Sequence, residues 1–170
     1  MRVILASRWI VPGGPGSTQL PAMIEGAVAA VVVVTTYNPF GESESATGRW
    51  LPWLRAGTAL AVTAAAIGLL SVAVAGAALP GGDLAMIRNT AGAAGLGLLC
   101  AGVVGGLLAW IGPLAYTVIA VIGIGERWTS PWTWPARTGL DRGAAICAGL
   151  AFGAGMVLIA VRGARNCVSD

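Results

Sequence analysis

Long uncharged apolar segments alternate with short polar segments along most of the chain. Residues 56–79 carry no charge over 24 positions, and a helix of that length measures about 36 Å, enough to cross a hydrocarbon core of roughly 30 Å. Residues 143–161 form a similar segment that ends at Arg162, a residue type that suits a helix C-terminus at the lipid headgroups. Both patterns predict transmembrane helices.

A further span is predicted over residues 20–37, which are apolar apart from Glu25 and precede the turn signal Asn38-Pro39. Arginine and a Pro-Gly-rich stretch interrupt the preceding residues, so we expect a loop or an interfacial segment there. The expected organisation is an N-terminal segment, a helical domain and a short tail, over residues 1–19, 20–165 and 166–170.

Residues 89–125 carry no charge over 37 positions. As one helix they would measure about 55 Å and tilt by nearly 60°, beyond the observed range of about 0–40°, so we expect a break at Gly105-Gly106 or at Gly112-Pro113. The break favours two spans, 89–105 and 107–125. The alternative is one span followed by a re-entrant half-helix from Pro113. The predicted fold class is therefore an all-α polytopic bundle of about five spans, or four plus a broken segment.

Composition supports a bilayer as the solvent of this chain. Mean hydropathy is +0.81 and 10% of residues are charged, against roughly 25% in soluble domains. We therefore expect a multi-pass protein of the cell membrane. The ten basic residues are all arginine and lie scattered, which argues against a nucleic-acid partner. Five spans place six arginines on one side and four on the other, a bias too small to assign an orientation.

Two polar segments, 38–55 and 126–142, are predicted loops that are rich in tryptophan. Their aromatic side chains favour an anchoring belt at the headgroups; the alternative is a lid over a substrate path. These tryptophans are Trp50, Trp53, Trp128, Trp132 and Trp134.

Small residues recur every fourth position near the centre of the chain and would form a ridge on one helix face, along which another helix backbone can approach closely. Both a role in internal packing and a role as an interface with a second copy or another membrane protein remain open. The ridge consists of Ala93, Gly97, Ala101, Gly105 and Ala109.

Glu25 is the one acidic residue within a predicted span. An ionisable group at the bilayer centre costs several kcal/mol, which makes it a functional candidate. However, Glu25 follows Leu20 by only five residues, about 8 Å along the helix, where it could reach the headgroups and suit a helix N-terminus. A buried functional role and an interfacial structural role are both compatible with the sequence.

Enzyme chemistry finds little support in the sequence. The chain has no His and no Lys, so a serine or cysteine nucleophile would lack its usual base. Clustered Cys and His for zinc are missing, as is a Gly-Lys-Ser/Thr phosphate loop. We therefore expect no catalytic residues, no metal and no cofactor, and assign any nucleotide hydrolysis to a partner chain.

Five segments together resemble uncharacterised actinobacterial membrane proteins that are similar to permease subunits of drug-export-type ATP-binding-cassette transporters. In such permeases six helices are usual, and the loop after the second helix contacts the ATPase. The first of the six helices would be missing here. The segments are Asn38–Glu42, Arg49–Arg55, Arg88–Gly92, Leu108–Tyr116 and Trp132–Arg137.

The resemblance implies that residues 38–55 are a coupling loop and that residues 126–142 face outside. It implies a permease-like component of an exporter that works with a separate ATPase subunit. The rival hypothesis is a non-transporting accessory or scaffold protein that packs through the small-residue ridge. The residues implied in contact with the ATPase are Glu42, Glu44, Arg49 and Arg55.

Overall fold

The computed structural model describes residues 16–35, 50–76, 82–126 and 130–162. These residues form five long helices and two short 3-10 helices, with no strand among them. The long helices are α2 (Gly16–Thr35), α4 (Leu51–Ala73), α5 (Gly82–Val103), α6 (Ile111–Gly125) and α7 (Arg142–Arg162). The 3-10 helices are η2 (Gly106–Leu108) and η3 (Trp134–Ala136).

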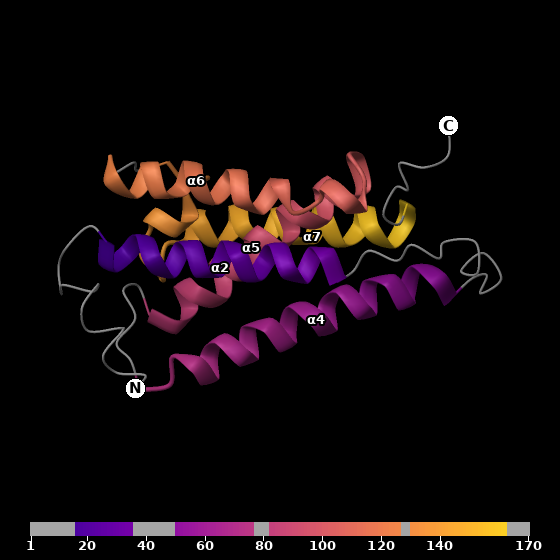
Figure 1. The fold of residues 1–170 in the computed structure, drawn as a ribbon, viewed down its shortest axis with the longest axis horizontal. Helices are drawn as coiled ribbons and strands as arrows, with labels where there is room; N and C mark the ends of the chain where they lie inside the picture. Colours follow the sequence, from indigo (N-terminus) through magenta and orange to yellow (C-terminus); the bar gives the residue numbers. More distant parts are fainter. Residues whose placement is uncertain (1–15, 36–49, 77–81, 127–129, 163–170) are drawn as a thin grey trace.

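The long helices run alternately up and down along one axis (Figure 1). We call the end at which α2, α5 and α7 begin and α6 ends the η3 end, because η3 lies there too. Helix α5 is central and contacts each of the other four, and 13 of its 22 residues are buried. Helix α4 diverges from α2 towards the η3 end (Figure 1).

Four segments are long and apolar enough to cross a membrane, namely α4, α5, the continuous η2–α6 segment and α7. The apolar part of α2, Gln19–Thr35, is shorter. In α4, η2–α6 and α7 only 22% of the apolar window is buried inside the protein, against 67% in α5. Outward apolar faces of this kind suit lipid contact. The expected all-α multi-pass bundle is confirmed.

The long neutral tract folds back between α5 and α6, as the two-span prediction requires. Gly105 has φ 125°, a backbone conformation that favours glycine, and η2 follows directly. Pro113 is the third residue of α6. At this position a backbone N–H has no acceptor within the helix, so proline removes no helical hydrogen bond. The tract is therefore neither a continuous rod nor a re-entrant half-helix starting at Pro113.

Three helices begin earlier than the sequence pattern predicts, and α2 does so at Gly16 rather than 20. Helix α4 begins at Leu51 rather than 56, because Pro52 suits a first turn and apolar residues follow it; Trp53 and Arg55 are helical and not part of a loop. Helix α5 begins at Gly82 rather than 89. It includes Arg88, whose charge is hydrogen-bonded inside the protein.

Helices α5 and α7 touch backbone to backbone. A Cβ added at Gly95 would overlap the Phe152 backbone, and a Cβ added at Gly155 would reach the Gly95 carbonyl oxygen and lie 3.0 Å from the Leu98 Cβ. Such close approach requires small residues and maximises van der Waals contact between helices.

The small-residue ridge is only partly a helix face. Ala93, Gly97 and Ala101 are buried on α5, but Gly105 and Ala109 lie in the turn after this helix because Gly105 ends the helical path. All five residues are buried inside the chain. The ridge packs internally and leaves no surface for a partner.

Candidate functional site

Three polar side chains on α2 and α5 meet inside the bundle near the η3 end. Asn89 Nδ2 donates to Glu25 Oε2 at 3.0 Å, and Asn89 Oδ1 accepts from Arg88 Nε at 3.2 Å and Nη2 at 3.1 Å. The relative exposures of Glu25, Asn89 and Arg88 are 7%, 6% and 8%. Asn89 therefore links a buried carboxylate to a buried guanidinium. Its amide NH₂ donates to the carboxylate and its amide oxygen accepts from the guanidinium.

Arg88 joins α5 to the segment between α6 and α7. Its Nη1 donates to the Thr138 carbonyl at 2.7 Å, and its Nη2 donates to the carbonyls of Trp134 and Arg137. Together with Asn89, these groups give the guanidinium four acceptors around its planar fork. Its charge is thereby compensated inside the protein, where an unpaired charge would be costly.

Trp134 anchors the same segment. Its ring stacks on Tyr116 with centroids 4.5 Å apart, and the Tyr116 hydroxyl donates to the Trp132 carbonyl at 2.7 Å. A side chain at Gly92 would come within 2.9 Å of the indole, so this glycine provides the space in which Trp134 lies. Trp134 is only 4% exposed, and its expected place in an aromatic belt is wrong.

The segment ends in a cap on α7. Asp141 Oδ1 accepts from the Ala144 N–H at 3.0 Å, and Asp141 Oδ2 lies 2.6 Å from Arg137 Nη2. The hydrogen bond from the Ala144 N–H and, to a smaller extent, the hydrogen bond from Arg137 hold the pKa of Asp141 below its usual value of 3.8. The Arg137 charge is thus already engaged by a carboxylate of its own segment.

Replacing Asp141 with alanine should lower the melting temperature of the purified protein at neutral pH, because the first turn of α7 loses its acceptor. A lowered folded pKa means that the carboxylate stabilises the fold above pH 3.8 and that this contribution is lost as the pH falls through the folded value. Thermal unfolding in detergent should therefore show a difference between variant and wild type that shrinks in acid. Asp83→Ala, at an exposed position in the first turn of α5, is the control. Equal melting temperatures for Asp141→Ala and wild type at neutral pH would contradict the role of the cap.

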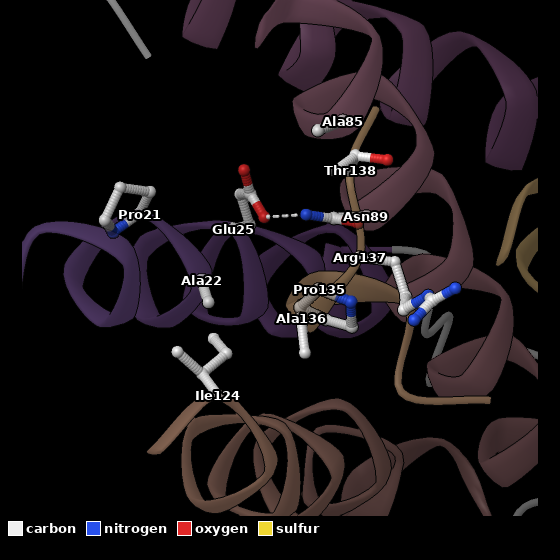
Figure 2. Close-up of a pocket in the computed structure, with 10 residues that line it drawn as sticks. All are labelled: Pro21, Ala22, Glu25, Ala85, Asn89, Ile124, Pro135, Ala136, Arg137 and Thr138. Atoms are coloured by element: carbon white, nitrogen blue, oxygen red, sulfur yellow. Dashed lines mark hydrogen bonds between the residues drawn. The ribbon is translucent and has the colours of Figure 1, made fainter. Parts of the chain in front are cut away.

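A cavity of about 210 Å³ opens beside Glu25. One Glu25 oxygen faces Asn89 and the other points away, into the space between Pro21 and Ala85 (Figure 2). The Arg137 guanidinium is directed away from Glu25 (Figure 2). Polar groups line the cavity at Glu25, Asn89, Arg137 and Thr138, and apolar side chains line it at Pro21, Ala22, Ala85, Ile124, Pro135 and Ala136.

Glu25 lies near the middle of α2. Helix α2 begins at Gly16, so Glu25 lies nine residues, or about 14 Å, along a helix of about 30 Å. The side chain is buried inside the protein, beside the first turn of α5 at Ala85 and the last turn of α6 at Ile124. Among the described residues, Asn89 is the one hydrogen-bond partner of Glu25.

The other residues proposed from the sequence do not join this site. Arg55 lies on α4 at the opposite end of the bundle (Figure 1), and Glu42, Glu44 and Arg49 lie outside the described residues. Trp50 and Trp53 are 73% and 75% exposed and Trp132 is 47% exposed, positions compatible with anchoring. Trp128 also lies outside the described residues.

Sequence reasoning missed the two residues that complete the site. The charge pattern makes Arg88 the boundary of a predicted span and Asn89 its first residue. The available signal was that Arg88-Asn89 directly precedes a long apolar run in a chain with few polar residues. Within a helix, such a pair needs internal partners.

A second cavity is an apolar groove of about 560 Å³ between α2 and α4. It follows the divergence of the two helices and offers no charged side chain, so it suits hydrocarbon. Within the described residues, no group of three or more His, Cys, Asp or Glu could hold a metal ion.

Comparison of the chain with protein-family models, curated proteins and solved structures finds no match.

Proposed function

We propose that the chain is the membrane-embedded, permease-like component of an exporter in the cell membrane, and that a solute enters the bundle at the Glu25 cavity. The observation that carries this proposal is the free Glu25 oxygen, which accepts no hydrogen bond from any described residue and faces a cavity although the side chain is buried. Burying a carboxylate among spanning helices is costly, and such residues commonly mark solute or ion paths. A purely structural acid would be expected to direct both oxygens to protein donors.

The energy source in this proposal is a separate ATPase subunit. The sequence contains no phosphate loop that could bind ATP, and the resemblance to exporter permeases assigns the ATPase contact to residues 38–55. Arg55, in the first turns of α4, is the described part of that contact. It lies at the end of the bundle opposite the Glu25 cavity (Figure 1).

Charge reversal at Arg49 and Arg55 together should abolish co-purification of a nucleotide-binding subunit with the tagged chain in mild detergent. The matched control reverses Arg162 and Arg165, because Arg162 ends α7 at the same end of the bundle as the start of α4 (Figure 1). The ATPase should be retained by the control, since its charges lie outside the proposed contact.

Recovery of the wild-type chain without any ATPase, alone or with unrelated membrane proteins, would overturn the coupled exporter and favour the scaffold hypothesis. A scaffold would need a surface other than the small-residue ridge, because α5 and the turn after it bury that ridge.

A further inference from the structure

We propose that the Glu25 cavity binds a small organic monocation, a protonated amine with a short apolar body, whose ammonium group sits against the free Glu25 oxygen. This inference rests on the proposed function in that it names the class of solute for the same site. The charge around the cavity, the chemistry of its wall and its size support it.

The charge argument begins with two arginines of the described residues: Arg137, which lines the cavity, and Arg88, which binds Asn89 beside it. Arg88 directs its guanidinium to Asn89 and to three backbone carbonyls, and it does not line the cavity. Arg137 lines the cavity, but its guanidinium binds Asp141 through Nε at 2.7 Å and Nη2 at 2.6 Å. Neither cation is directed at the space that Glu25 faces, so the group that remains to be neutralised there is a carboxylate oxygen. An anion would meet this oxygen unfavourably, whereas an ammonium donor would form a charge-assisted hydrogen bond.

The residues that line the cavity favour an organic cation over a metal ion. Among the described residues, Glu25 is the one carboxylate that lines the cavity, while Ca²⁺ and Mg²⁺ require about six or more oxygen ligands. The side chains of Pro21, Ala22, Ile124 and Pro135 present hydrocarbon instead of oxygen. Such a surface stabilises an apolar body through burial and dispersion.

Size limits the solute. A cavity of about 210 Å³ is smaller than sites for drug-sized ligands, which occupy about 300–1,000 Å³. At about 30 Å³ for each water-sized unit, it holds on the order of seven non-hydrogen atoms. Asn89 fixes the Glu25 carboxylate by its bond to Oε2, so the free oxygen is held in place before the amine arrives, which lowers the cost of binding.

The test is a ligand-observed NMR titration of propylammonium chloride with the full chain in nanodiscs of zwitterionic phosphatidylcholine. Saturable binding is expected in the millimolar range, the scale for a ligand of so few atoms. Glu25→Gln keeps the shape but removes the charge and should weaken binding at least tenfold. Glu126→Gln, at an exposed position just after α6, should bind within twofold of wild type. 1-Propanol, which lacks the charge, and tetrabutylammonium, which exceeds the cavity, should not bind saturably.

Ala85→Leu fills the cavity from α5 while leaving Glu25 in place, so it provides a second test if Glu25→Gln fails to fold. It should also weaken binding at least tenfold. Absence of saturable propylammonium binding to wild type, or equal affinities for wild type and either cavity variant, would overturn the inference. Because this experiment requires no ATPase, amine binding without ATPase co-purification would refute only the coupled exporter. Co-purification without amine binding would refute only the solute class.

Discussion

Replacing Arg88 with alanine is expected to lower the free energy of unfolding by about 3–5 kcal/mol, the range for removing one partner from a buried charged network. The carbonyls of Trp134, Arg137 and Thr138 would each lose a hydrogen bond from the guanidinium. Asn89 Oδ1 would lose both of its bonds to Arg88. The segment between α6 and α7 should then detach from α5, because three of the lost bonds join them.

Reversible unfolding of the purified protein in mixed micelles, followed by circular dichroism, measures this change. Arg142→Ala is the matched control: Arg142 is exposed and is the first residue of α7, where a cation is not favoured by the helix dipole, so its stability should change by less than about 0.5 kcal/mol. Arg88→Lys should remain strongly destabilised, because an ammonium group cannot reproduce the planar fork that reaches four acceptors. Equal stability of Arg88→Ala and Arg142→Ala would contradict the role assigned to this network.

The span pattern could be predicted from the sequence because lipid imposes a length on uncharged segments. Residues 143–161 match α7 to within one residue at each end, since arginines flank them. The fold-back of residues 89–125 follows from length alone. The same rule failed at Arg88, which it treated as excluded from the membrane. A single charge can enter a spanning helix when distant segments supply its acceptors, and those acceptors lie 46 to 50 residues further along the chain.

Only one part of the candidate site, Glu25, could be predicted from the sequence, and the reason is again that the partners lie far apart in the chain. Glu25 stands out as a lone acid in an apolar run, but its partner Asn89 lies 64 residues away, a separation that no local pattern reports. The predicted position of Trp134 in an aromatic belt was wrong because a Trp-Pro-rich segment is typical of the membrane interface. Its inward position depends on Tyr116 and on the space above Gly92, and both become apparent only once the helices pack.

The contact between α5 and α7 leads to the second large effect. Replacing Gly95 with alanine should destabilise the bundle by about 3 kcal/mol, the upper part of the range for overpacking. The added Cβ would meet the backbone of Ala151 and Phe152, and backbone inside a helix cannot move aside as a flexible side chain can. The two helices would have to separate, which would cost van der Waals contact along α7 that lipid only partly replaces.

Gly153→Ala is the matched control for Gly95→Ala. A Cβ at Gly153 would meet no atom within 4 Å, and alanine is the better helix former by up to about 1 kcal/mol in water. The same unfolding experiment should therefore show Gly153→Ala at or slightly above wild-type stability while Gly95→Ala falls well below it. If both substitutions had the same effect, glycine would act through helix propensity, and the backbone contact between α5 and α7 would not be what holds the bundle together. The comparison separates these explanations because the two variants make the same chemical change and differ in what the new methyl group meets.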